Sequence, residues 1–533
     1  MKILDCTLRD GGFVNNWEFG KSSVINICER LDYAGINIIE LGYLRDYVEY
    51  SEDNTQFSCV KDISRVIDQK PAKAEMYVAI IDYGSCSLDR ICPAEESIID
   101  GIRVTFKKNQ LDEAVPFIKA IADKGYKVFM QPVSVTDYTD ADVIRLVERA
   151  NELQPYAVYI VDTYGFMHKR DLMRYWILLN TMLNKDICIG YHAHNNFQLA
   201  YANAIELMEI NTSRTVIIDS SAFGMGKGAG NANTELIALY LNENFGYDYD
   251  ISQILEIIDT YIEKIREKNY WGYSLLYYLA ASNDCHHNYV RYLIEKKTLS
   301  VKSINEILSS ISPERKTKFD KTYIEELYQT YQGRNKSGRK DLDELEKALS
   351  EGDILLIGPG SSINSEKDRI REYIAQNASA VISVNHLSPA VTADFIFISN
   401  VKRYEQLNAV IGRNSELSSK IILTSNITPS QLKPDYVVDY TALVMENSNV
   451  NYDNSLLMLI ELLKQMGVKK VSLAGFDGYD SAKENYFAQD MEFGSDEKEF
   501  EERNAAVGEK LAELDKSIGI RFLTESKYQK KMN

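Results

Sequence analysis

Two histidines separated by one residue are the residues in this chain whose type and spacing point most directly to chemistry. His192 and His194 lie in the run ICIGYHAH, whose apolar residues predict a β-strand. Because successive side chains of a strand point to opposite faces, both imidazoles lie on the same face. Asp10, which follows the first predicted strand, completes a set of two histidines and one carboxylate. Such a set can hold a divalent metal ion and leave positions open for substrate and water.

The expected chemistry is the formation or collapse of an enolate. An ion held by Asp10, His192 and His194 can chelate a 2-oxo acid through its carboxylate and ketone oxygens and polarise the carbonyl group. Arg9 can donate cationic hydrogen bonds to the enolate oxygen. We expect Mn²⁺ or Mg²⁺, because open coordination positions and oxygen donors suit these ions better than a closed zinc site does. The alternative for the histidine pair is two hydrogen-bonded polar residues at a strand end.

A glycine-rich segment, SSAFGMGKGAGNAN at residues 220–233, follows the last predicted strand of this region. Its glycines, with Gly226 and Gly228 as the candidate substrate-binding positions, allow the backbone to approach a ligand closely. Asn231 is a candidate contact to the metal or the substrate. The segment is neither a P-loop nor a dinucleotide-binding fingerprint, because its spacing matches neither motif. The alternative is a flexible loop.

Further polar residues lie on, or directly after, predicted strands. Arg103 is a candidate contact for a substrate carboxylate, and Glu40, Asp162 and Tyr164 are candidate catalytic groups. Active sites of parallel barrels lie where the strands end, which is the reason for weighing these positions. For Glu40 and Asp162 the alternative is a hydrogen-bonded carboxylate at a strand end.

Eight short apolar runs in the first 221 residues must position these side chains. Each run is followed by a turn and a helical pattern, as in parallel β/α units. Eight such units over roughly 240 residues predict a (β/α)8 TIM barrel, whereas an open doubly wound sheet usually has fewer strands. The runs are residues 3–5, 36–41, 76–81, 101–106, 128–133, 157–162, 187–194 and 215–219.

The remainder of the 533-residue chain predicts a helical extension of the barrel and a second, smaller α/β domain. The predicted organisation is a catalytic TIM barrel at 1–240, a helical extension at 241–332, a linker at 333–352 and a Rossmann-like domain at 353–533. Within the extension, residues 270–289 concentrate aromatics with His286 and His287. These residues could form a second metal site. The favoured interpretation is an amphipathic helix that packs on the barrel or on a second subunit.

The predicted C-terminal domain opens with a strand that runs into a Gly-Pro-Gly-Ser-Ser turn. Gly358, Gly360, Ser361 and Ser362 of this turn are candidates for binding phosphate or a nucleotide through backbone amides. The turn lacks the P-loop lysine and the GxGxxG spacing, so the alternative is a structural or regulatory domain. It bears a faint resemblance to the opening of Rossmann-like domains that handle nucleotides or nucleotide-linked sugars.

Three motifs together resemble the DRE-TIM superfamily of metal-dependent lyases and synthases. They are TLRDG after the first strand, HAHNN on the seventh and GMGKGAGNA after the eighth. The details are similar to the aldolase branch rather than to the branch that condenses acyl-CoA thioesters. The resemblance implies that Asp10, His192 and His194 are the metal ligands, that Arg9 stabilises the enolate, and that Asn231 lies near the metal.

The sequence departs from that family at two points. Phe13 occupies the place of the histidine that acts as base in the aldolases, and the glycine-rich segment lacks the cysteine of the coenzyme A thioester lyase. The base and the aldehyde or ketone partner therefore stay unassigned. The candidates for the base are Tyr164, Glu40, Tyr43, His168 and a metal-bound water.

The sequence as a whole predicts a cytoplasmic metal-dependent aldolase that acts on a 2-oxo acid such as pyruvate and an aldehyde or ketone, as a homodimer. The chain has 78 acidic and 60 basic side chains, and the resulting net charge of -18 argues against nucleic-acid and membrane partners. Two alternatives stay open. One is a Claisen-type synthase that joins an acyl-CoA to a 2-oxo acid, and the other is a non-catalytic, metabolite-binding regulatory protein.

Overall fold

The computed structural model describes the chain except for residues 297–298, 317, 333–338, 350–352, 390, 412–417, 444–453, 483, 489–490, 492–496 and 533. The described residues form two compact units, Met1–His287 and Asn288–Asn533. None of the helices described in either unit combines the length and the apolar character that crossing a membrane requires.

The first unit is built on a closed barrel of eight parallel strands, as the eight apolar runs predicted. Consecutive strands lie side by side, and β1 pairs with both β9 and β2, which closes the barrel. The short strand β3 (Gln56–Phe57) extends one edge of β2. The barrel strands are β1 (Lys2–Asp5), β2 (Ile38–Leu44), β4 (Met76–Asp82), β5 (Gly101–Phe106), β6 (Lys127–Pro132), β7 (Ala157–Asp162), β8 (Cys188–Ala193) and β9 (Val216–Ser220).

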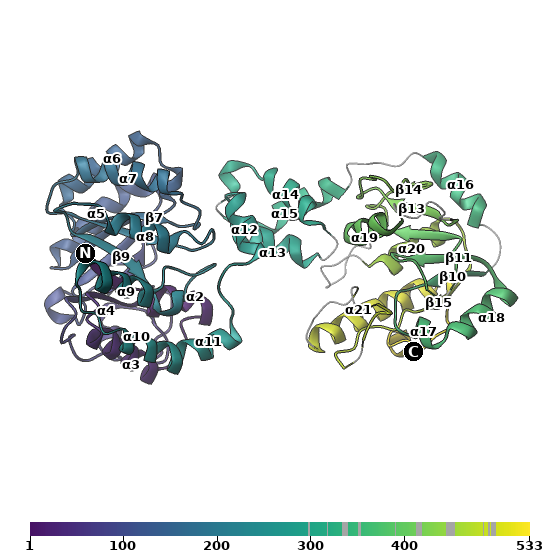
Figure 1. Cartoon of the computed structure of the whole chain (residues 1–533), viewed down its shortest axis with the longest axis horizontal. Coiled ribbons are helices and arrows are strands. Elements are labelled where there is room, and N and C mark those ends of the chain that lie inside the picture. The colour runs from purple at the N-terminus through teal and green to yellow at the C-terminus, as the bar shows by residue number, and fades with distance from the viewer. Residues whose placement is uncertain are drawn as a thin grey trace. The chain divides into compact units, whose positions relative to one another are not determined.

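Helices surround these strands, and α3, α6, α7 and α10 lie at the periphery of the unit in Figure 1. Two short helices, α1 (Thr7–Asp10) and α2 (Gly12–Asn15), follow β1 at the carboxyl end of the barrel. The others are α3 (Lys21–Tyr33), α4 (Val60–Ile63), α5 (Leu111–Asp123), α6 (Asp140–Leu153), α7 (Lys169–Met182), α8 (Ala200–Met208), α9 (Thr234–Phe245), α10 (Ile251–Ile257), α11 (Glu263–Lys268) and α12 (Leu275–Ser282).

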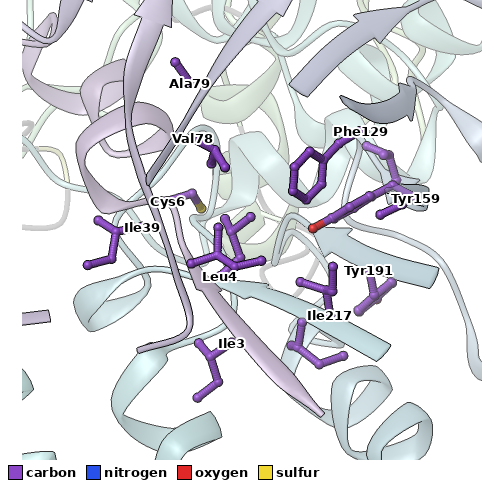
Figure 2. Close-up of a cluster of buried hydrophobic side chains, with 14 of the residues drawn as sticks. Ile3, Leu4, Cys6, Ile39, Val78, Ala79, Phe129, Tyr159, Tyr191 and Ile217 are labelled. Atoms are coloured by element: carbon purple, nitrogen blue, oxygen red, sulfur yellow. The ribbon is translucent and has the colours of Figure 1, made fainter. Parts of the chain in front are cut away.

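The barrel interior is filled with side chains, and small residues make room for large ones. Figure 2 shows Phe129 and Tyr159 among the buried apolar side chains, and their ring centroids lie 6.4 Å apart. Gly190 pairs with Tyr159 across β7 and β8, and a Cβ at Gly190 would lie 2.2 Å from the Tyr159 ring. Larger residues at this position of β8 would therefore displace the ring from the core.

The second unit contains a parallel sheet of seven strands in the order β14-β13-β12-β11-β10-β15-β16. Alternate side chains of β10 enter two different cores, with Ile354 and Leu356 in one and Leu355 and Ile357 in the other. Helices therefore cover both faces, as expected for a parallel sheet. The strands are β10 (Asp353–Ile357), β11 (Ala378–Val384), β12 (Phe395–Ile398), β13 (Lys420–Thr424), β14 (Tyr436–Val438), β15 (Lys470–Ala474) and β16 (Gly519–Phe522).

The helices of the second unit fall into those that precede the sheet in the chain and those that follow its first strand. Those that precede the sheet are α13 (His287–Glu295), whose first residue belongs to the first unit, α14 (Val301–Ser309), α15 (Lys321–Gln332) and α16 (Arg339–Leu349). Those that follow β10 are α17 (Ser362–Ser365), α18 (Lys367–Asn377), α19 (Val401–Ile411), α20 (Ser455–Gln465), α21 (Glu497–Asp515) and α22 (Gln529–Met532).

The region between the two sheets differs from the sequence prediction. Helix α16 lies inside the segment 333–352 that we predicted as a linker, and its Leu345 and Leu349 are buried in a core of the second unit. Two leucines one helical turn apart are an amphipathic signal that the many charged residues around them obscured. The predicted barrel extension at 241–332 is also divided, since residues from Asn288 onward pack within the second unit.

Candidate active site

The site begins at the carboxyl end of β1, where α1 carries Arg9 and Asp10 into the barrel mouth. Thr7 fixes the start of this helix, because its N–H donates to Asp5 Oδ1 at 2.9 Å and its hydroxyl accepts from the Ala222 N–H at 2.8 Å. The turn after β1 is therefore tied to the turn after β9. Both Arg9 and Asp10 are buried as a result.

Asp10, His192 and His194 come together, as the sequence predicted. One potential ligand atom from each lies within 4.8 Å of the others, and all three side chains are buried. His192 Nδ1 lies 3.0 Å from Asp219 Oδ2, which leaves its Nε2 for a metal ion. Among the described residues, Nδ1 of buried His194 has no hydrogen-bond partner. A buried nitrogen without a partner beside a carboxylate is the environment of a metal ligand, so the donor set fits a divalent ion.

Two arginines and three carboxylates form an ionic network at the ligand set. Arg9 donates from Nε to Glu40 Oε2 at 2.7 Å and from Nη1 to Asp10 Oδ1 at 2.5 Å. Arg103 pairs with the same Glu40 oxygen at 2.8 Å and also with Asp219. The network holds one more negative than positive charge, which favours a cation at the histidines.

The electrostatics keep the ligand atoms in the protonation states that bind metal. Burial would raise the pKa of Asp10, but the charge of Arg9 and the hydrogen bond from Asn231 hold it well below its usual range. Burial lowers the pKa of His194 to about 3, so its imidazole is neutral at pH 7. The pKa of Asp219 is also lowered, because Arg103 and His192 outweigh its burial.

The glycine-rich segment closes over Asp10. A Cβ at Gly226 would lie 2.5 Å from Asp10 Oδ2 and 2.2 Å from Asn231 Nδ2, so only glycine fits there. Asp10 Oδ2 accepts from Asn231 Nδ2 at 2.8 Å and from the Lys227 N–H at 3.2 Å. Gly228 has φ +71°, and its segment donates through the Ala229 N–H to the side chain of Asn196.

Three of the predicted site residues are held by other groups of the protein. Arg103 is fully buried between Glu40 and Asp219, so it holds carboxylates in place and is not exposed to a substrate. Glu40 Oε2 accepts from Arg9 and forms an ion pair with Arg103, which leaves only Oε1 for other contacts. Asp162 accepts from the Phe166 and Met167 N–H groups and so shapes the turn after β7.

A small cavity of about 40 Å³ lies beside His194 and includes residues that the sequence analysis did not place there. Tyr164 lines it, as do Lys227 and Gly228 from the glycine-rich segment. Helix α12 and the residues after it supply Tyr277, Cys285, His286 and His287. The aromatic stretch thus reaches the barrel mouth. Its two histidines were visible in the sequence, but their nearness to His194 was not.

Phe13 lies in an aromatic group at the same end of the barrel. Its ring centroid is 4.7 Å from that of Trp17, and Lys227 Nζ lies 5.3 Å from it. Trp17 donates from its indole N–H to the Arg9 carbonyl at 2.7 Å, which anchors the group to α1. The position where the family has a basic histidine is therefore apolar and 37% exposed.

The predicted phosphate-binding turn of the second unit already holds a carboxylate of its own chain. Ser362 donates from its N–H to Asp477 Oδ2 at 2.8 Å and from its hydroxyl to Asp477 Oδ1 at 2.5 Å. A Cβ at Gly360 would lie 2.6 Å from the same carboxylate, and one at Gly358 would lie 2.4 Å from the Gly475 carbonyl oxygen. Ser361 directly precedes this helix. These glycines therefore allow close packing against β15 and the turn after it, and Asp477 occupies the place of a phosphate.

Residues 1–260 match the family model described as HMGL-like. Among curated proteins, the chain is similar to an oxaloacetate decarboxylase of Mycobacterium tuberculosis, with 27% identity over 45% of this chain and 69% of the relative. It is also similar to a 4-hydroxy-2-oxovalerate aldolase of Geobacillus genomosp. 3, with 26% identity over 50% of this chain and 78% of the relative.

One solved structure, the N-terminal domain of a putative aldolase from Bacteroides vulgatus, is 25% identical with a TM-score of 0.49. The match covers 57% of this chain and 99% of that domain. An HMG-CoA lyase from Brucella melitensis is 17% identical with a TM-score of 0.40, over 50% of this chain and 98% of that chain.

Proposed function

We propose that the barrel, residues 1–240, is a divalent-metal-dependent carbon–carbon lyase that cleaves a 2-oxo acid to the enolate of pyruvate and an aldehyde or ketone. The observation that carries this proposal is the buried set of Asp10, His192 and His194 with Arg9 bonded to Asp10. A divalent ion held there, Mn²⁺ or Mg²⁺, supplies Lewis acidity to the 2-oxo group. The names of the curated relatives support a 2-oxo acid as substrate.

Arg9 stabilises the enolate oxygen in this proposal. Its guanidinium is oriented by Glu40 and Asp10, and its buried position strengthens any hydrogen bond that it makes to developing negative charge. In aldol cleavage of a 4-hydroxy-2-oxo acid, the bond between C3 and C4 breaks and its electron pair forms the enolate. The proton of the C4 hydroxyl goes to a base, and C3 receives a proton when pyruvate forms.

The base comes from the cavity beside His194 in this proposal, since Phe13 cannot accept a proton. Tyr164 and His286 both line that cavity. Burial and the charge of Lys227 lower the pKa of His286, which keeps its imidazole neutral at pH 7 and able to accept a proton. Burial raises the pKa of Tyr164, which makes this phenol the weaker candidate.

Decarboxylation of a 2-oxo acid such as oxaloacetate is the second candidate, and the phenylalanine at position 13 favours it. When CO₂ leaves from C3, the electron pair of the broken bond forms the same enolate. No hydroxyl proton has to be removed, so no base is required for the cleavage step. The oxaloacetate decarboxylase among the relatives is consistent with this reaction.

One set of measurements with the full-length protein tests both candidates. Exchange of the methyl protons of pyruvate in D₂O, followed by NMR with and without Mn²⁺, reports enolate formation. Pyruvate release from 4-hydroxy-2-oxo acids and from oxaloacetate then separates the two reactions. We expect His192→Ala to abolish exchange and release, whereas Lys185→Ala, at an exposed residue before the amino end of β8, keeps them. Exchange without a metal requirement, or exchange that survives in His192→Ala, would refute the proposal.

A further inference from the structure

The second unit contains a cavity of about 390 Å³ that the lyase proposal does not use. Residues that follow four neighbouring strands line it: Gly360 after β10, Asn385 after β11, Asn400 after β12 and Gly475 after β15. Strand β10 lies inside the sheet, between β11 on one side and β15 on the other, where the order of the strands reverses. Ligands of open parallel sheets bind at this switch point, outside the carboxyl ends of the strands. The volume lies in the ~300–1,000 Å³ range of small-molecule sites.

The lining carries a local excess of positive charge. Among the described residues that line it, the charged ones are four cations, Lys296, Lys402, Arg403 and Arg503, and one carboxylate, Asp477. This contrasts with the excess of acidic side chains in the whole chain. Four cations around one cavity point to an anionic ligand.

Arg403 is the cation best placed to meet an anion. Its guanidinium donates to two neutral acceptors, Gln406 Oε1 at 2.9 Å and the Met491 carbonyl at 2.8 Å, and it lies 5.7 Å from the centre of the Tyr486 ring. These contacts orient the side chain, and within the part of the chain that the structure describes no carboxylate pairs with Arg403. By contrast, Lys296 pairs with Glu325 at 3.0 Å and Arg503 pairs with Glu499.

The helices that begin at the cavity are already capped by side chains of the protein. Asn400 Oδ1 accepts from the Lys402 N–H at the start of α19, and Asn454 Oδ1 accepts from the Leu456 N–H at the start of α20. Asp477 caps α17 in the same way. An anion in this cavity is therefore recognised by the cationic side chains, and not by the helix N-termini.

Aromatic side chains complete the lining. Phe476, Tyr479, Tyr486 and Tyr528 border the cavity with the cations. Aromatic faces stack on planar rings, whereas a site for inorganic phosphate alone needs only charge and hydrogen bonds. We propose that this cavity binds a nucleoside phosphate, with the phosphates at Lys402 and Arg403 and the base against the aromatic side chains. The cavity borders the glycine turn that the sequence analysis indicated, since Gly360 lines it. The proposed phosphate contacts, Lys402 and Arg403, come from another part of the chain.

Calorimetric titration of the full-length protein tests this assignment. The probes are ADP, GDP, CDP and UDP, with inorganic pyrophosphate and uridine as the two halves of the ligand. We expect at least one diphosphate to bind more than about 10-fold tighter than either half. Binding by none of the four, or equal binding of pyrophosphate, would overturn the proposal.

Three variants locate the site. Arg403→Gln and Lys402→Gln should each weaken binding by about 10-fold or more, because each removes a charged partner of the phosphates. Lys402 is exposed, so its variant keeps the test valid if Arg403→Gln unfolds. Lys469→Gln removes the same charge at the amino end of β15 and should leave binding unchanged. Equal affinities in all three variants, or equal losses, would place the ligand elsewhere.

Discussion

Asp219 is predicted to control the metal affinity of the barrel without touching the metal. Its carboxylate lies 3.0 Å from His192 Nδ1, so His192 is held as the tautomer whose Nε2 lone pair faces the ligand set. His192 and Arg103 both contact Asp219 Oδ2. In Asp219→Asn, an amide nitrogen in the place of Oδ2 would oppose Arg103 and favour the other tautomer of His192. An amide oxygen in that place would keep both contacts but without the negative charge that strengthens them.

The expected size of the effect follows from these contacts. Loss of a partner of this kind typically weakens metal binding by about 10–100-fold, which corresponds to about 1.4–2.7 kcal/mol. The variant also leaves buried Arg103 with Glu40 as its remaining carboxylate partner, which costs about 3–5 kcal/mol of stability. Binding must therefore be measured below the unfolding temperature, with circular dichroism as the check on folding.

Glu40→Gln is the matched control. It removes the same charge from the same ionic network and also takes a carboxylate from Arg103, but Glu40 has no hydrogen bond to either histidine. We expect Mn²⁺ affinity, measured by electron paramagnetic resonance titration, to fall by less than about 5-fold in this variant. Equal losses of affinity in Glu40→Gln and Asp219→Asn would refute the role of Asp219 in orienting His192.

Three further outcomes are expected. Gly226→Ala should weaken Mn²⁺ binding, because the added Cβ would displace the segment that donates to Asp10. The control Gly519→Ala, whose Cβ would have only an ordinary contact at 3.6 Å, should leave Mn²⁺ binding unchanged. Equal Mn²⁺ affinities of the two variants would contradict this prediction. Mn²⁺ at 100 times its Kd should stabilise the barrel by about 2.7 kcal/mol in thermal unfolding, and His192→Ala should remove this gain. Burial raises the pKa of Asp162 from 3.8 to about 7, so between these two pH values the folded state binds more protons than the unfolded state. The free energy of unfolding should therefore fall as the pH rises from 3.8 to about 7, on the order of a few kcal/mol. Asp162→Asn should flatten that part of the stability profile, and an unchanged slope in urea titrations would contradict the assignment.

The sequence predicted the barrel because each of its strands is a short apolar run between turns. All eight runs became strands, and the order of the motifs along the chain placed Asp10, His192 and His194 at strand ends that a closed barrel brings together. Strand β16 was not predicted, because its sequence GIRF is too short and too exposed to show an apolar pattern. Helix α16 escaped because charged residues dominate it.

The surroundings of the charged side chains were harder to predict from the sequence than the strands were. Arg103 was predicted to meet substrate, but it lies fully buried between two carboxylates. Whether a buried arginine faces a ligand or an ion pair depends on which strands become its neighbours. The pairing of β5 with β4 and β6 is local, whereas the approach of Asp219 spans 116 residues.

The sequence by itself determined the type of fold and the placing of Asp10, His192 and His194 at strand ends, because the period of a strand and the position of a strand end are local properties. Only the tertiary structure decided which carboxylate orients His192, that α12 and the residues after it line the cavity beside His194, and that Asp477 fills the glycine turn of the second unit. These contacts join residues far apart in the chain. The closure of the barrel and the order of strands in the second sheet decide which of these residues meet. Neither the closure nor the strand order is encoded in a local sequence pattern.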